Sequence, residues 1–97
     1  MTRVVYTQNA LDNLERVFSF LAEHDPGAAV DAAATIRSAV EILADHPLIG
    51  RRVEGEIREL IISYGKNGYV ALYRFLPERS LIRILALRHQ RELDYSD

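Results

Sequence analysis

The hydrophobic residues of the N-terminal half recur every three or four positions, which is the spacing of one face of an α-helix. The first set consists of Ala10, Leu14, Val17, Phe18, Leu21 and Ala22. The second set consists of Ala29, Ala33, Ile36, Val40, Leu43 and Ala44. The pattern predicts two amphipathic helices, the first ending near His24. The small residues that begin the second set favour close packing of the pair as a helical hairpin.

Capping and helix-breaking residues mark the expected ends of these helices. Thr7 is a suitable N-cap for the first helix, and Asp25 for the second. Pro26 suits the first position of the second helix, where its missing N–H is not needed. Pro47 disfavours the α conformation in the residue before it, and Gly50 is a second helix breaker, so the second helix is expected to end before residues 46–50.

Runs of β-branched and aromatic residues predict strands on both sides of the hairpin. The run Arg3 to Tyr6 precedes the first helix. After a short expected loop with Arg51-Arg52, three further runs follow, at Ile57 to Tyr64, Tyr69 to Leu76 and Leu81 to His89. Turn-forming residues at 65–68 and 77–80 separate these runs. The predicted fold class is α+β: a short N-terminal strand, a two-helix hairpin, a three-stranded antiparallel meander and a short C-terminal tail.

Four-residue turns would place Tyr64 opposite Tyr69 and Leu76 opposite Leu81, and this pairing assigns every strand residue to a face. One face collects Ile61, Ser63, Val70, Leu72, Leu76, Leu81, Leu85, Leu87 and His89, with a row of Glu59, Arg74 and Arg83. The other collects Arg58, Leu60, Ile62, Tyr64, Tyr69, Ala71, Tyr73, Phe75, Ile82, Ile84, Ala86 and Arg88. Ala71 and Ala86 leave room for a helix, so we expect the second face to form the core. The first face is then an exposed apolar surface, which is typical of an interaction site.

Length and composition narrow the class of protein. A chain of 97 residues fits one domain, residues 1–97, and can bury a core without disulfides or metals. The absence of Cys excludes a thiolate zinc site and a Cys nucleophile, and the three His lack the spacing of metal ligands. No cofactor or metal is therefore expected. Neither a signal peptide nor a membrane-spanning run is expected, and a cytoplasmic location fits best.

Charge is distributed unevenly along the chain. The formal net charge is -2, but residues 51–97 carry nine basic and seven acidic side chains, against three and seven in residues 1–50. Eleven of the twelve cations are Arg, whose planar guanidinium suits bidentate contacts. The C-terminal half is therefore a candidate surface for an anion or a protein partner.

Two groups of side chains in that half carry candidate chemistry. The row of Glu59, Arg74 and Arg83 is either an anion site or, more commonly, a cross-strand charge ladder. His89, Arg91 and Tyr95 bring together an imidazole, a guanidinium and a phenol, the side-chain types that ribonuclease chemistry uses for proton transfer and phosphate stabilisation. The same residues also fit a solvated strand end, and both interpretations remain open.

The order of elements and several short segments resemble the ParE/RelE superfamily of toxins from bacterial toxin-antitoxin systems, also called plasmid stabilisation proteins. The resemblance covers nearly the whole chain. It rests on the helix after Tyr6, the link His46-Pro47-Leu48-Ile49-Gly50-Arg51, Arg58-Glu59-Leu60, Tyr69 to Arg74, and Ile84 to Arg91 followed by Tyr95. It implies one of two activities, because RelE-like members cut messenger RNA on the ribosome and ParE-like members poison DNA gyrase without being nucleases.

The nucleases of this superfamily carry cations at positions that correspond here to Ile61, Ser63 and Val70. Without those cations the charge of the phosphate transition state would not be neutralised. A ribosome binder is also usually strongly basic, and this chain is not. The resemblance therefore implies a ParE-like protein that inhibits DNA gyrase by binding it. A RelE-like nuclease using His89, Arg91 and Tyr95 is the alternative, and an inactive member that only binds an antitoxin is the third possibility.

The resemblance also implies a cognate ParD-like antitoxin, whose disordered segment folds onto the toxin, covers apolar surface and neutralises Arg. Operator DNA would be bound only indirectly, through the antitoxin, and the expected assembly is a hetero-oligomer with no membrane contact. The candidate partner-binding residues are Arg58, Arg74, Arg83, Arg88, His89 and Arg91.

Overall fold

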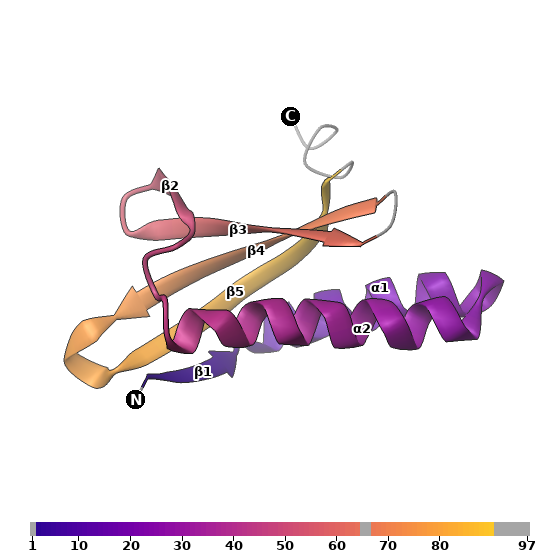
Figure 1. Cartoon of the computed structure of the whole chain (residues 1–97), viewed down its shortest axis with the longest axis horizontal. Helices are drawn as coiled ribbons and strands as arrows, with labels where there is room; N and C mark the ends of the chain where they lie inside the picture. The colour runs from indigo at the N-terminus through magenta and orange to yellow at the C-terminus, as the bar shows by residue number, and fades with distance from the viewer. Residues whose placement is uncertain (1, 65–66, 91–97) are drawn as a thin grey trace.

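Two helices lie side by side on one face of a five-stranded sheet in the computed structural model, which describes residues 2–64 and 67–90 (Figure 1). Among the residues that the structure describes, neither α1 nor α2 packs on the opposite face, which we call the outer face. The elements in chain order are β1 (Arg3–Tyr6), α1 (Gln8–His24), α2 (Pro26–Glu41), a 3-10 turn (Ile42–Ala44), β2 (Arg51–Glu54), β3 (Ile57–Tyr64), β4 (Asn67–Leu76), a second 3-10 turn (Pro77–Arg79) and β5 (Leu81–His89). The predicted α+β class and the helical hairpin are confirmed.

Both helices begin at the predicted caps. The Thr7 hydroxyl oxygen accepts a hydrogen bond from the Ala10 N–H at 3.2 Å, and the Asp25 carboxylate accepts one from the Ala28 N–H at 3.1 Å. Pro26 occupies the first turn of α2. These bonds satisfy N–H groups that have no partner within the helix, which explains why each helix begins where it does.

The inward surface of α2 differs in part from the predicted one. Ile36, Val40 and Leu43 belong to the cluster that packs on the sheet, as expected. Ala32 is fully buried, whereas Ala33 is only half-buried. The difference arises because α2 packs against α1 as well as the sheet, and this widens the face that must be buried.

The sheet has the strand order β1-β5-β4-β3-β2, with β1 parallel to β5 and the other pairs antiparallel. The predicted meander of β3, β4 and β5 is confirmed. The expected loop with Arg51-Arg52 is wrong, since Arg51–Glu54 forms the edge strand β2 on β3. The Arg51 guanidinium binds the Glu59 carboxylate across this pair, with Nε and Oε1 3.0 Å apart, and this ion pair holds the short strand in register.

One of the two predicted turns has the expected register. Leu76 lies opposite Leu81, but Tyr64 lies opposite Asn67 instead of Tyr69, because β4 begins two residues earlier than predicted. Tyr69 therefore pairs with Ile62. A shift of two residues preserves the alternation of side chains, so the two faces of β3 and β4 are unchanged.

A β-bulge in β5 changes the faces of that strand. Tyr73 pairs with Ile84, whereas the preceding residue Leu72 pairs with Ala86, so Leu85 is an extra residue. Beyond a bulge the alternation is displaced by one position. Leu87 is therefore buried in the helix-facing core, while Ala86 lies opposite Leu72 on the outer face, the reverse of the prediction.

The beginning of α1 holds this bulge. The Thr7 hydroxyl donates to the carbonyl of Ile84 at 2.8 Å, and the Asn9 side-chain amide donates to the carbonyl of Leu85 at 2.9 Å. The Leu87 N–H donates to the side-chain oxygen of Asn13 at 3.0 Å. Because β1 ends at Tyr6, these polar side chains continue the pairing of β5 where no strand lies beside it.

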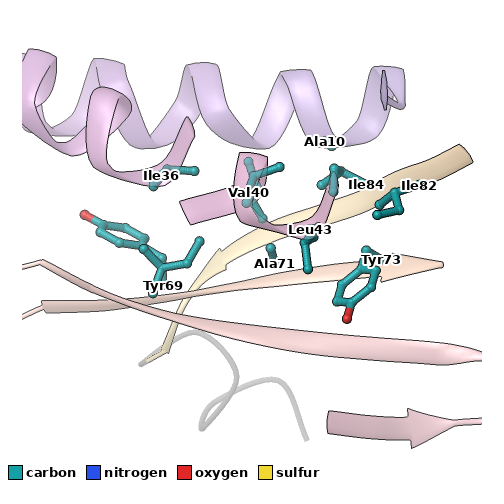
Figure 2. Close-up of a cluster of buried hydrophobic side chains, with 11 residues drawn as sticks. Ala10, Ile36, Val40, Leu43, Tyr69, Ala71, Tyr73, Ile82 and Ile84 are labelled. Carbon is teal, nitrogen blue, oxygen red and sulfur yellow. The ribbon is translucent and has the colours of Figure 1, made fainter. Parts of the chain in front are cut away.

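The core lies between the helices and the face that we expected to be buried (Figure 2). Ile36 and Val40 of α2 and Leu43 point toward the aromatic and aliphatic side chains of the sheet. The buried sheet residues of this cluster are Ile62, Tyr69, Ala71, Tyr73, Ile82, Ile84 and Leu87. The helix-facing assignment is confirmed for every one of them except Leu87, which the bulge moves there.

The Tyr73 hydroxyl connects the core to the link between α2 and β2. It donates to the Pro47 carbonyl and accepts from the Gly50 N–H, both at 2.8 Å. A Cβ atom at Gly50 would lie 2.6 Å from Tyr73 Oη, so no larger residue fits without movement. Arg58 adds hydrogen bonds to the carbonyls of Leu48 and Gly50. The link is thus fixed by two side chains of the sheet.

Replacing Asn13 with Ala should destabilise the fold by about 1–2 kcal/mol, because the half-buried Leu87 N–H loses its acceptor. Ser19→Ala is the matched control, since Ser19 is exposed on the same helix and the gain in helix propensity is similar. Urea unfolding of both variants measures the difference in free energy of unfolding. Equal stabilities of the two variants would contradict a stabilising role for the hydrogen bond between Asn13 and the Leu87 N–H.

Tyr73→Phe should lower the free energy of unfolding by about 2 kcal/mol, since the buried Gly50 N–H and the Pro47 carbonyl lose their partner. Tyr6→Phe serves as the control, because no hydrogen bond of the Tyr6 hydroxyl occurs among residues 2–64 and 67–90. Thermal unfolding followed by circular dichroism measures the stability of both variants. If the Tyr73→Phe protein were as stable as the control, the two hydrogen bonds of the Tyr73 hydroxyl would contribute little to the stability of the fold.

Candidate functional site

The outer face carries three of the six predicted partner-binding residues, Arg74, Arg83 and Arg88. Arg74 lies between Tyr73, which is buried in the core, and Phe75, which packs against it, and Arg83 lies between the buried residues Ile82 and Ile84. Side chains alternate along a strand, so both guanidiniums point away from the helices. Arg74 and Arg83 are direct register partners on β4 and β5, and both are exposed.

The predicted row of Glu59, Arg74 and Arg83 is wrong. Register places Ile57, not Glu59, beside Arg74. Glu59 lies opposite Leu72 and binds Arg51 of β2. The error follows from the shift of two residues between β3 and β4 and from the unexpected strand β2. As a result the one carboxylate expected to neutralise the two guanidiniums has another partner.

Arg58 has a role within the fold. Its guanidinium donates to the carbonyl of Gly50 at 2.7 Å and to that of Leu48 at 3.2 Å. Its side chain is half-buried and held against the link between α2 and β2. This candidate partner-binding residue therefore stabilises a loop next to the sheet.

The bulge exchanges the positions of Arg88 and His89. Arg88 was expected on the core face, but it lies opposite Val70 on the outer face. His89 was expected on the outer face, but it lies opposite Tyr69 on the helix-facing side. The rings of His89 and Tyr69 meet edge to face, with their centroids 5.3 Å apart and the planes at 88°. The imidazole therefore lies against a buried aromatic ring of the core.

The three residues of the alternative nuclease site cannot be assembled from the described part of the chain. Arg91 and Tyr95 lie outside the described residues. Ile61, Ser63 and Val70, which match the nuclease cations, lie on the outer face, and Val70 is 1% exposed. The sheet separates these three positions from His89.

Arg3 is a residue that the sequence reasoning did not include in the site. Val4 and Tyr6 pack on the core, so Arg3 and Val5 of β1 point to the outer face. Val5 is the register partner of Arg83, and Arg3 that of Leu81. A short strand gives no signal of the strand beside which it will lie, so only the parallel pairing with β5 brings Arg3 to this surface.

Burial raises the pKa of two tyrosines, Tyr73 and Tyr6, neither of which lies on the outer face. It raises the pKa of Tyr73 above its ordinary value of 10.0, against the opposing effects of the Gly50 hydrogen bond and of Arg58. It also raises the pKa of Tyr6, and Glu41 acts in the same direction. Neither phenol is suited to exchange a proton near neutral pH.

Groups of His, Asp and Glu suited to hold a metal ion do not occur in residues 2–64 and 67–90. Within the same described residues, neither helix is long and apolar enough to cross a membrane.

Comparison with known proteins agrees with this fold. Residues 4–94 match the family described as ParE toxin of type II toxin-antitoxin system, parDE. Toxin RelE3 of Caulobacter vibrioides is 36% identical over 92 residues, which cover 95% of this chain and 98% of the relative. Toxin RelE2 of the same organism is 30% identical over 93 residues, covering 96% and 100% of the two chains.

Solved structures share the architecture at lower identity. A chain of the chromosomal ParDE system from P. aeruginosa superposes with a TM-score of 0.76 at 22% identity, over 92% of this chain and 96% of that one. A chain of the RelBE2 complex from Mycobacterium tuberculosis gives a TM-score of 0.63 at 21% identity, over 92% and 98%. The family match spans nearly the whole sequence, and this chain therefore belongs to the ParE toxins of type II toxin-antitoxin systems.

Proposed function

We propose that this chain inhibits DNA gyrase by binding to it, without cleaving nucleic acid, and that a cognate antitoxin neutralises it in the cytoplasm. The observation that carries the proposal is the position of His89 relative to the outer face. In a nuclease of this fold the acid-base group and the phosphate-binding cations must converge on one substrate. Here His89 packs on Tyr69 on the helix-facing side, and the matching cation positions lie on the other side.

The side chains at those positions support the same proposal. Ile61 is 51% exposed, Val70 is buried, and Ser63 is uncharged. A cation that stabilises a developing phosphate charge is normally worth several kcal/mol, and an aliphatic group supplies none of this. A protein that acts by binding needs no such residues.

The antitoxin partner is proposed because the similar solved structures come from toxin-antitoxin systems. The P. aeruginosa structure is of a ParDE system and the M. tuberculosis structure is of a toxin-antitoxin complex. This chain exposes large apolar side chains on its helices, among them Phe20 at 63% and Val30 at 59%. Surface of this kind is suited to be covered by an antitoxin segment that folds as it binds.

The nuclease alternative is favoured by one finding, which is that the curated relatives are named RelE toxins. The two functions differ in what stops first in the cell. Gyrase inhibition arrests DNA synthesis while translation continues, whereas messenger RNA cleavage arrests translation.

Induction of this chain alone should therefore reduce thymidine incorporation within minutes, before methionine incorporation changes. The purified chain should also inhibit supercoiling of relaxed plasmid by gyrase, and leave messenger RNA intact in a ribosome-containing translation reaction. Early loss of methionine incorporation, together with cleaved messenger RNA, would contradict the proposal.

The His89→Ala variant provides a second test that distinguishes gyrase inhibition from messenger RNA cleavage. A nuclease that used the imidazole for proton transfer should lose about 10²–10⁴-fold of its cleavage rate. Under the proposed function the same variant retains supercoiling inhibition, because the imidazole lies against Tyr69 on the helix-facing side of the sheet and no proton transfer is needed for binding. Circular dichroism of the variant confirms that it is folded, and complete loss of toxicity in a folded His89→Ala protein would favour the nuclease.

A further inference from the structure

The edge strand β2 contributes no side chain to the core. All four of its residues are exposed, with Val53 at 44%. The other edge strand, β1, differs, because Val4 and Tyr6 pack against the buried cluster. Burial of apolar surface within the chain therefore does not explain why β2 is paired with the sheet.

Polar contacts fix β2 in place instead. The Arg51 guanidinium binds the Glu59 carboxylate of β3 through Nε and Nη2. The Arg52 guanidinium donates from two nitrogens to the carbonyl of Gly55, at 3.2 and 3.1 Å. Gly55 has a φ of 52°, a turn conformation that favours glycine. The strand is thus held ready, while one side of its backbone has no strand beside it in the described sheet.

A β-bulge at Val53 places two opposite charges on the same face of β2. Arg51 lies opposite Glu59 and Glu54 lies opposite Ile57, so a step of three residues on β2 matches a step of two on β3. Glu59 and Ile57 share the outer face, because side chains two apart on a strand point the same way. Arg51 and Glu54 therefore both point to the outer face.

Both charged groups can accept a further partner. Arg51 is 78% exposed, and its Nη1 group makes no hydrogen bond within residues 2–64 and 67–90. Glu54 has no ion-pair partner in that part of the chain. A strand with a guanidinium at one end and a carboxylate at the other is complementary to itself. When two copies lie antiparallel, Arg51 of each copy faces Glu54 of the other.

We propose that β2 pairs antiparallel with β2 of a second copy of this chain, about a two-fold axis between Arg52 and Val53. Two ion pairs between Arg51 and Glu54 then flank the axis on the outer face. The two five-stranded sheets continue as one across the axis, an isologous association in which both copies use the same surface.

The charges of β2 select this partner over other strands. Charged side chains on an edge strand generally oppose pairing with a second sheet. A strand of unrelated sequence would leave Arg51 or Glu54 beside an apolar or like-charged group, which costs free energy. A second copy presents the cation and the carboxylate in the order that satisfies both. Because the contact is short, we expect a weak dimer, with a Kd on the order of micromolar to millimolar.

Sedimentation equilibrium of the full chain at increasing protein concentration tests the proposal. The measured mass should rise from that of the 11.0 kDa monomer toward that of a dimer. Glu54→Arg should weaken dimerisation by about tenfold or more, because it places a second guanidinium beside Arg51 of the other copy. Glu23→Arg is the matched control, since it makes the same change of charge at an exposed position of α1 and should leave dimerisation unchanged.

A variant with reversed charges tests the register. Arg51→Glu/Glu59→Arg keeps an ion pair within the chain but places a carboxylate beside Glu54 of the other copy, so this variant should not dimerise with itself. Mixed with Glu54→Arg, it should form a heterodimer, because both contacts across the axis again join opposite charges. Fluorescence anisotropy with one variant labelled detects the heterodimer, and circular dichroism confirms that both variants are folded.

Cross-linking adds a readout that is independent of charge. The chain contains no Cys, so a single introduced thiol can form a disulfide only with another copy. In the proposed register the Cα atoms of the two Val53 residues lie about 6 Å apart, within the range of a disulfide. Val53→Cys should therefore form a covalent dimer under mild oxidation faster than Val30→Cys, which places the thiol at an exposed position of α2.

Each of four results would overturn the proposal: a chain that stays monomeric up to about 1 mM, equal effects of Glu54→Arg and Glu23→Arg, folded reversed-charge variants that do not combine, or cross-linking of Val53→Cys no faster than that of Val30→Cys. These measurements contain neither gyrase nor an antitoxin. Their outcome therefore bears on the pairing of β2 alone, and the supercoiling assay bears on the proposed function alone.

Discussion

The hydrogen bonds between the first two turns of α1 and the bulge in β5 determine how the rest of this protein is arranged. Thr7 caps α1 and binds the Ile84 carbonyl with the same hydroxyl, and Asn13 accepts from the Leu87 N–H. These contacts orient the helix on the sheet at the point where β1 ends. They also allow β5 to carry one residue more than β4 without leaving its backbone groups unpaired.

The bulge has a consequence for function as well as for packing. It turns His89 toward Tyr69 on the helix-facing side and Arg88 toward the outer face beside Val70. His89 and the positions that match the nuclease cations thereby lie on opposite sides of the sheet. The outer face retains guanidiniums and aliphatic side chains, a composition suited to binding a protein segment.

The sequence contained clear signals for local structure. The caps at Thr7 and Asp25, and the runs that form β1, β3 and β5, each depend on residues within a few positions, and each was predicted correctly. Alternation along β3 and β4 was sufficient to identify the helix-facing side, since a register error of two residues leaves the faces unchanged.

Signals for the site were weaker, because they depend on pairing between distant segments. In Leu85-Ala86-Leu87 every residue is apolar, so the alternation of β5 gives no indication of an extra residue. Arg51-Arg52 has the composition of a loop and becomes a strand only by pairing with β3. The approach of Arg3 to Arg83 depends on which edge of the sheet receives the first strand.

The sequence by itself determined the class of fold, the helix ends, the family and the apolar composition of both sheet faces, because these properties follow from periodicity and from residues close in the chain. Only the tertiary structure decided the register of β3 on β4, the bulge in β5 and the approach of Arg3 to Arg83. The bulge and the position of Arg3 depend on contacts between segments more than seventy residues apart, such as the hydrogen bond from Thr7 to Ile84, whose partners no local pattern specifies.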